Sequence, residues 1–222
     1  MTEIGLFEAI YSTRSMRRLK PDPIPEETLK KIIDAGVHAP SGSNFQNWAF
    51  VLVQDSDDKR FIRDHYLKTY QELERLGSIP AMADLPLDRQ RMFASAIYLA
   101  EYLHKAPVIL LACTGTDFPT YANTDNPRSI TATLHASIYP AVQNILLACR
   151  ALGVGATLTT VHYFFEDELK QRLGIPEDKE IASLIPLGYP VGRFGPTSRG
   201  PVEEVIHWGR WGKRQEEGIL QD

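Results

Sequence analysis

Two short segments near the N-terminus concentrate side chains that could hold a charged group and a polar ring. Residues 13–18 read Thr-Arg-Ser-Met-Arg-Arg, which places three guanidinium groups and two hydroxyls within six residues. Residues 39–48 read Ala-Pro-Ser-Gly-Ser-Asn-Phe-Gln-Asn-Trp, a turn of small residues followed by amides and aromatic rings. Guanidinium groups bind phosphate oxygens bidentately, and amides hydrogen-bond the edge of a polar ring. The two segments are therefore candidates for a binding site.

The first segment gives a candidate phosphate clamp. Arg14 and Arg17 could grip a phosphate because a guanidinium fork matches its oxygens, and Ser15 could bind a remaining oxygen. Arg199 would join them from far along the chain. The alternative is a solvated basic turn that leads into a proline-rich linker.

The second segment gives a candidate ring-binding loop. Gly42 allows close approach of the backbone, while Asn44 and Gln46 could hydrogen-bond the edge of a ring. The alternative is an ordinary helix-to-strand loop with Trp48 in the core. Taken together, the two segments indicate a bound flavin mononucleotide (FMN), although neither does so alone.

Composition excludes several classes of function. The 222 residues include 24 lysines and arginines against 28 aspartates and glutamates, so no general attraction to nucleic acid or an anionic membrane is expected. The six histidines lack ligand spacing, and no metal is expected. Cys113 and Cys149 lie in apolar runs and are predicted to be reduced core thiols. With no apolar stretch of about 18 residues and no export signal recognised, a cytoplasmic protein is expected.

Hydrophobic periodicity predicts the elements that must position these segments. Helices are expected over residues 2–12, 25–38, 137–152 and 166–173, and strands over residues 49–53, 107–113 and 181–187. Residues 155–161 should form a short strand or an extended turn. The runs 49–53 and 107–113 are continuously apolar, which is typical of central strands buried on both faces. Residues 56–105 should form two helical pieces joined by an irregular segment. Helices alternating with four or five strands favour an α/β or α+β sandwich, in one domain over residues 1–222.

The C-terminal region, residues 189–222, differs from the rest of the chain. It is rich in Gly, Pro and Arg up to Pro201 and then carries Trp208 and Trp211. Large apolar side chains in such a tail mark a contact surface. We therefore expect the tail to pack across a partner subunit.

Five separated motifs resemble the nitroreductase family in their order and spacing. Besides residues 13–17 and 39–48, they lie at 143–155 (containing Gln-Asn-Ile-Leu-Leu-Ala and Ala-Leu-Gly-Val-Gly), 185–190 (Ile-Pro-Leu-Gly-Tyr-Pro) and 199–205 (Arg-Gly-Pro-Val-Glu-Glu-Val). The resemblance covers about residues 5–208 and is weakest over 56–105. It implies an FMN-dependent homodimer with a three-layer α-β-α fold, a mostly antiparallel central sheet of four or five strands, two flavin sites at the subunit interface, and a C-terminal arm that crosses to the partner.

By motif position, the resemblance assigns residues to parts of the flavin. Arg14, Ser15 and Arg199 would hold the phosphate, and Ser41 the ribityl or phosphate end. The others would lie along the ring, with Arg17 near N1 and O2, Asn44 at the pyrimidine edge, and backbone amides of 157–160 facing N5 and O4. The full assigned set is Arg14, Ser15, Arg17, Ser41, Gly42, Asn44, Gln46, Thr159, Thr160 and Arg199.

Two positions depart from the family pattern, and one assignment has an alternative. Thr13 stands where the family usually has a second basic residue, and Asn47 replaces the usual proline before the tryptophan. The Thr160 hydroxyl could bind flavin N5 directly. Equally, the threonines of residues 157–160 could serve strand packing.

The resemblance implies an oxidoreductase that takes hydride from NADH or NADPH and reduces nitroaromatics, quinones or similar electron-poor acceptors in a ping-pong cycle. The flavin carries the chemistry, so no catalytic side chain is assigned, and residues 56–105 would form a lid. Three alternatives stay open: a reductive dehalogenase resembling iodotyrosine deiodinase, kept open by Thr160; a flavin-destroying enzyme like the family's benzimidazole synthase; and a non-catalytic flavin-binding protein. No motif specifies the physiological acceptor, the choice between NADH and NADPH, one- or two-electron transfer, or the lid residues that contact substrate.

Overall fold

A four-stranded antiparallel sheet forms the centre of the computed structural model, which describes residues 4–79, 85–115 and 127–214. The strands are β1 (Trp48–Val53), β2 (Val108–Gly115), β3 (Gly155–Ala156) and β4 (Lys179–Gly188), in the spatial order β1-β2-β4-β3. Each neighbouring pair is antiparallel. The predicted number and direction of the strands are confirmed.

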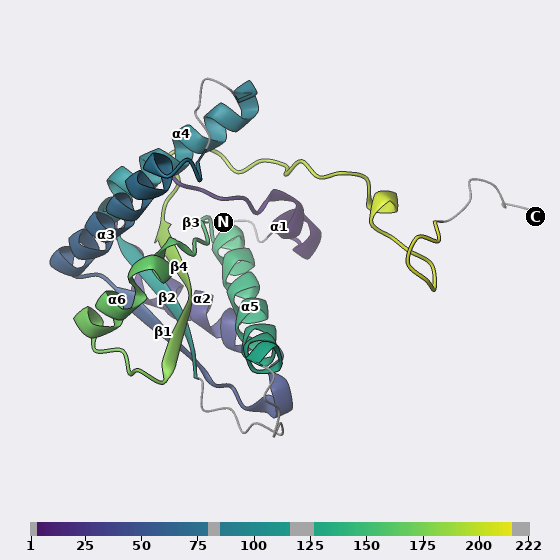
Figure 1. Ribbon diagram of the computed structural model, residues 1–222, viewed down its shortest axis with the longest axis horizontal. Helices are drawn as coiled ribbons and strands as arrows, with labels where there is room; N and C mark the ends of the chain where they lie inside the picture. The colour runs from purple at the N-terminus through teal and green to yellow at the C-terminus, as the bar shows by residue number, and fades with distance from the viewer. Residues whose placement is uncertain (1–3, 80–84, 116–126, 215–222) are drawn as a thin grey trace, which may run out of the picture.

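Helices cover both faces of this sheet (Figure 1). Helices α2 (Glu26–Val37) and α5 (Pro127–Ala151) pack on one face, and α3 (Ser56–Arg75), α4 (Leu87–Tyr102) and α6 (Glu166–Leu173) on the other. Side chains of β2 alternate between the two cores: Leu110 belongs to the α2–α5 core and Leu111 to the α3–α4 core, and both are fully buried. The predicted three-layer α-β-α, α+β architecture is confirmed.

Local sequence explains most helix ends. Helix α2 ends at Val37, shortly before Pro40 as predicted. Helix α3 begins after Asp55, whose carboxylate accepts the backbone N–H groups of the second and third residues that follow. Helix α6 ends at Gly174, which takes the left-handed φ of 66° that glycine tolerates. The two predicted helical pieces within 56–105 correspond to α3 and α4.

Two predictions on the elements need correction. Strand β1 is an edge strand rather than a central one, because it pairs only with β2 among the described strands. Its side chains are accordingly half-buried or exposed, and only Val53 is buried. Helix α5 begins at Pro127 rather than at residue 137. The apolar residues from which it was predicted begin only at Ile138, so the earlier turns were missed.

The two ends of the chain carry apolar side chains into solvent. Helix α1 (Leu6–Ser12) exposes Phe7 and Tyr11, while the C-terminal segment leaves the body as an extended arm (Figure 1). On that arm Trp211 is 90% exposed. Cys113 and Cys149 are buried free thiols, as predicted.

Candidate functional site

A cavity lined by several polar side chains lies between α1, the C-terminal half of α5 and the arm. This cavity has a volume of about 490 Å³ and includes Arg14, Ser15, Arg150 and Arg199. Further hydroxyl groups come from Thr13, Thr157 and Thr197, and apolar walls from Ile10, Leu146, Val154 and Phe194. We refer to it as the arginine cavity.

The arginine cavity fits a phosphate group. Sequence analysis placed Arg14, Ser15 and Arg199 together, and the structure brings all three to this cavity. Neither Arg14 nor Arg199 forms an ion pair with a residue in the described ranges; Arg199 Nη1 donates only to the adjacent Ser198 carbonyl, at 2.7 Å. Two guanidinium groups without carboxylate partners in the described ranges provide donors for a phosphate dianion. The Thr13 and Thr197 hydroxyls already donate to the Ala9 and Tyr11 carbonyls.

Arg150 was not predicted as a site residue. It lies in the last turn of α5, and its side chain is 14% exposed. Its Nε donates to Ser12 Oγ at 2.7 Å, its Nη2 lies 3.3 Å from Glu8 Oε1, and its guanidinium covers the Phe194 ring at 4.5 Å. Arg150 therefore ties α1 and the start of the arm to α5. A basic residue near the end of a predicted helix was the only sequence signal for it.

Two glycines let the basic segment lie directly on the end of the sheet. A Cβ on Gly155 would lie 2.9 Å from Leu19 Cδ2, and one on Gly188 would lie 3.0 Å from Leu19 Cβ. Backbone hydrogen bonds fix this position, from Met16 N to the Ala156 carbonyl at 2.9 Å and from Lys20 N to the Tyr189 carbonyl at 2.8 Å. The glycines of two separated motifs thus serve to position Arg14 and its neighbours.

A second polar group lies beyond the basic segment, toward α3. Tyr66 is buried, and its hydroxyl forms a 2.9 Å hydrogen bond with Thr159 Oγ1. Burial raises the pKa of both Tyr66 and Tyr70, and the nearby charge of Arg17 opposes that rise. Thr159 is thus bound to Tyr66, while Thr160 is exposed. Arg17 and Thr159 thus both lie close to Tyr66.

The predicted ring-binding loop lies elsewhere. Gly42 N donates to Ser137 Oγ at 3.1 Å, which places the loop beside the N-terminal half of α5. Ser137 precedes Arg150 by 13 residues, so the two are separated by about 20 Å along the helix axis. Within one chain, Ser41, Gly42, Asn44 and Gln46 therefore do not meet the arginine cavity.

The loop itself has an unusual backbone. Ser43, Asn44 and Gln46 have positive φ values of 48°, 57° and 50°. Non-glycine residues in this region are strained and cluster at functional sites. The turn is held internally, because Gln46 N donates to Ser41 Oγ at 3.1 Å. The loop is thus a preformed structure in a strained conformation, consistent with a binding role.

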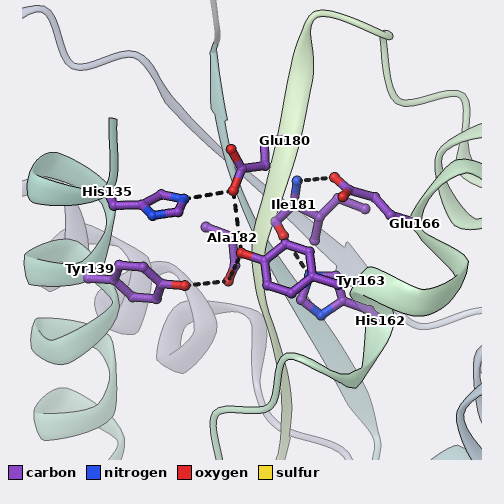
Figure 2. A network of polar contacts seen from close by, with 8 residues as sticks. All are labelled: His135, Tyr139, His162, Tyr163, Glu166, Glu180, Ile181 and Ala182. Carbon is purple, nitrogen blue, oxygen red and sulfur yellow. Dashed lines mark hydrogen bonds and ion pairs between the residues drawn. The ribbon is translucent and has the colours of Figure 1, made fainter. Parts of the chain in front are cut away.

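A polar network fixes the start of β4 between α5 and the short helix η4 (Val161–Phe165), as Figure 2 shows. From α5, His135 Nε2 lies 2.7 Å from Glu180 Oε1, and Tyr139 donates to the Ala182 carbonyl at 3.0 Å. From the other side, the Tyr163 hydroxyl donates to Glu180 Oε1 at 3.3 Å. This network anchors the chain that leads from Thr160 back to the sheet.

Burial shifts the pKa values of several groups in this network, among them His162 and Glu166. His162 is fully buried, and its Nε2 bonds the Ile181 carbonyl at 2.5 Å. Burial lowers its pKa, because the imidazolium form would lose hydration. Glu166 accepts Ile181 N at 2.7 Å, yet burial raises its pKa.

The described residues contain neither a membrane-spanning helix nor a cluster of metal-binding side chains. No helix there combines the length and apolar character needed to cross a bilayer. No group of three or more His, Cys, Asp or Glu side chains in that part of the chain is arranged to hold a metal ion.

The α-β-α sandwich thus carries an arginine-lined cavity beside a basic segment that packs on Gly155 and Gly188. The sequence profile described as "Nitroreductase family" matches residues 10–189. The chain belongs to the nitroreductase family, and it is a flavin-dependent oxidoreductase.

Curated relatives have different activities. The chain is 27% identical to a protein named NADH dehydrogenase from Thermus thermophilus, over 90% of this chain and 94% of that one. It is 28% identical to iodotyrosine deiodinase 1 from Rattus norvegicus over 83% of this chain, but it spans only 61% of that relative's length. The family relationship therefore does not by itself fix the substrate.

Solved structures share the fold. A BluB-like flavoprotein from Clostridium difficile 630 has a TM-score of 0.70 and 26% identity, over 93% of this chain and 100% of that one. An iodotyrosine deiodinase bound to FMN and 3-iodo-L-tyrosine has a TM-score of 0.68 at 22% identity, over 93% and 99%. The NADPH:FMN oxidoreductase from Vibrio harveyi, complexed with NAD⁺, has a TM-score of 0.68 and 22% sequence identity, over 95% of this chain and 79% of that one.

Proposed function

We propose that this protein is an FMN-dependent, NAD(P)H-consuming homodimer that reduces nitroaromatics, quinones or similar electron-poor acceptors. The observation that carries the proposal is the arginine cavity, where Arg14 and Arg199 face several hydroxyls without a described carboxylate partner. These residues would bind the FMN phosphate. FMN, when bound, supplies the electron-transfer chemistry, and the protein supplies binding, orientation and electrostatics.

We infer that each flavin site is shared between two subunits. One chain separates its arginine cavity from its ring-binding loop by about 20 Å along α5, so the loop would serve the partner's cavity. Exposed apolar side chains on α1 and the arm, including Phe7 and Trp211, support such an interface. The arm would cross to the partner, and Ser41, Gly42, Asn44 and Gln46 would face the partner's flavin.

The chain's own groups have separate roles in this site. Arg17 would stabilise negative charge at the N1 and O2 edge without reorganisation, because the segment from Met16 to Lys20 is fixed on the sheet. The chain from Thr157 to Thr160 would lie along the edge that carries N5 and O4. Helices α3 and α4 would form the wall over the flavin that limits water and selects acceptors. Donor and acceptor would bind in turn over the same face.

The proposal is tested on the purified full-length protein. We expect a yellow protein that retains FMN, elutes as a dimer, loses its flavin absorbance when NADH or NADPH is added anaerobically, and recovers it on addition of a nitroaromatic. A colourless protein that takes up no added FMN would overturn the proposal. A bound flavin that neither nicotinamide reduces would contradict the enzymatic part and support a binding protein.

A further inference from the structure

Arg150 contacts the two segments that carry the arginines assigned to the FMN phosphate. Its Nε donates to Ser12 Oγ at 2.7 Å, and Ser12 lies two residues before Arg14. Its guanidinium carbon lies 4.5 Å from the centre of the Phe194 ring, and Phe194 lies five residues before Arg199. Arg150 and Phe194 both line the arginine cavity. One side chain of α5 therefore connects two segments that are far apart in the sequence.

The contact with α1 fixes the last turn of that helix. Ser12 is buried, and its hydroxyl accepts from Arg150 while it donates to the Glu8 carbonyl at 2.5 Å. Arg150 Nη2 lies 3.3 Å from the Glu8 carboxylate. The chain therefore leaves α1 toward Arg14 from a position that Arg150 holds.

The arm has two anchor points on the body just before Arg199. The first is the Phe194 ring, packed on the guanidinium of α5. The second is Thr197, whose backbone N and hydroxyl both donate to the Tyr11 carbonyl of α1, at 2.9 and 3.2 Å. Within the described chain, no hydrogen bond, ion pair or ring contact joins residues 198–214 to the body. These two points therefore place Arg199 in the cavity.

We propose that Arg150 positions Arg14 and Arg199 as one unit, so that binding of the FMN phosphate and docking of the arm on α1 strengthen each other. The inference rests on the proposed function, because it requires FMN in the arginine cavity. Such coupling between two events is reciprocal. A phosphate held by both arginines favours the docked arm, and the docked arm brings Arg199 to the phosphate. Arg150 is a positioning residue, since its described contacts are with α1 and the arm.

The test compares FMN with riboflavin, which lacks the phosphate. Full-length protein freed of flavin is titrated with each compound by flavin fluorescence, and the ratio of the two dissociation constants gives the preference for FMN. We expect Arg150→Met, which keeps a long side chain but removes its charge and donors, to lower this preference about five- to tenfold. Riboflavin affinity should change little. A role of Arg150 in overall stability alone would weaken both compounds alike and would overturn the inference.

Two further variants separate positioning from simple attraction between charges. Phe194→Leu removes the ring but leaves every charge in place, and it should lower the preference for FMN about two- to fivefold. Arg150→Lys keeps the charge without the planar fork and should give an intermediate preference. Combined with Arg150→Met, Phe194→Leu should add little, because both changes break the same contact. Wild-type preference in both Arg150→Lys and Phe194→Leu would reduce the role of Arg150 to its charge and overturn the inference.

A matched control lies on α6. The Arg172 guanidinium carbon lies 5.6 Å from the centre of the Phe61 ring, and its Nε donates to Asp58 at 2.7 Å, so this arginine has the same kinds of partner. It does not line the arginine cavity. Arg172→Met should therefore leave the preference for FMN unchanged. An equal loss in both methionine variants would count against a specific role of Arg150.

Hydrogen exchange measures the arm's side of the coupling. In the wild type, the amides of residues 194–199 should exchange more slowly with FMN bound than with riboflavin bound, and this difference should shrink in Arg150→Met. Equal exchange with the two compounds in the wild type would overturn the coupling.

The outcomes distinguish this inference from the proposed function. A wild type that binds no FMN, or bound FMN that neither NADH nor NADPH reduces, would refute the proposed function. Bound and reducible FMN, with the same preference in wild type, Arg150→Met and Phe194→Leu, would overturn the inference alone. If Arg150→Met does not fold, Phe194→Leu still decides, because its change lies on the arm and outside the two cores.

Discussion

Tyr66 Oη and Thr159 Oγ1 lie 2.9 Å apart, and this hydrogen bond joins α3 to the segment that follows β3. Tyr66 is 4% exposed, so its hydroxyl has little access to water as an alternative partner. We predict that Thr159→Val, which leaves the buried phenol without its partner, lowers the free energy of unfolding by about 1–3 kcal/mol. Tyr66→Phe removes the phenol itself and should cost less, about 1 kcal/mol.

A double-mutant cycle measured by urea unfolding checks this pair. Because the two side chains share one interaction, the double variant should be less destabilised than the sum of the single variants. Strict additivity would mean that the hydrogen bond contributes nothing. Release of FMN from Thr159→Val, measured by flavin fluorescence, would show in addition that the bond positions the segment at the flavin.

Gly188 provides a second test of the site's structure, because the basic segment packs directly against it. A Cβ there would lie 2.9 Å from Pro107 Cδ and 3.0 Å from Leu19 Cβ. We predict that Gly188→Ala costs about 1–3 kcal/mol of stability and also weakens FMN binding, since Leu19 must shift and carries the segment with it. Thermal unfolding and FMN titration measure the two effects.

A matched control is available four residues later. Gly192 has no heavy atom within 4 Å of the Cβ that alanine would add, and its φ is not in the left-handed region. Gly192→Ala should therefore leave both stability and FMN affinity near the wild-type values. Equal behaviour of the two variants would argue against the support role of Gly188.

Sequence patterns predicted which elements form the three layers of this fold, but not which strand lies at an edge of the sheet. Both β1 and β2 are apolar runs, but only their neighbours decide that β2 is buried on both faces while β1 lies at an edge. Spacing along the chain carries no such information. The early turns of α5 were missed although Leu134 is buried and His135 contacts Glu180 of β4, because the polar residues of the run 127–137 interrupt the apolar pattern there.

The candidate site was predictable only in part. Motifs identified Arg14, Ser15 and Arg199, which the cavity brings together. Arg150 was missed because its partners, Ser12 and Glu8, are about 140 residues away and no local pattern connects them. The assignment of the loop to the same flavin stays a prediction, since its distance from the cavity within one chain requires a second subunit.

The assignment of Arg14 and Arg199 to the FMN phosphate predicts that replacing either residue weakens FMN binding. Arg14→Ala and Arg199→Ala should each weaken FMN binding about 10- to 100-fold, because each removes a charge-assisted hydrogen bond worth about 1.5–3 kcal/mol. Riboflavin, which lacks the phosphate, should bind wild type and variants alike. Arg89→Ala, an exposed arginine on α4 without a described ion pair, serves as the control. Unchanged FMN affinity in both cavity variants would refute the assignment.

Because His162 is buried, part of the protein's free energy of unfolding should be lost at acid pH. Burial lowers its pKa in the folded state, so the unfolded chain takes up a proton first as the pH falls. The stability contributed by neutral His162 is thus present above about pH 6.5 and is lost as the pH drops toward the folded pKa. The loss is at most about 1.4 kcal/mol per pH unit.

Comparison with His162→Gln isolates this component, because all other titrating groups are common to both proteins. Between pH 7.5 and pH 5, wild type should lose stability relative to the glutamine variant in urea unfolding. A difference that does not change with pH would show that His162 titrates alike in both states.

If each flavin site is shared between two subunits, a mixed dimer of two differently defective subunits should regain FMN binding. A subunit with Arg14→Ala and Arg199→Ala lacks the phosphate half, and one with Ser41→Ala and Asn44→Ala lacks the loop half. In a mixed dimer, one of the two sites combines the intact cavity of the second subunit with the intact loop of the first. We therefore expect about one FMN per mixed dimer, against almost none in either parent. If each flavin were held within a single chain, both sites of the mixed dimer would carry a defect, and co-expressed, doubly tagged and purified dimers would stay colourless.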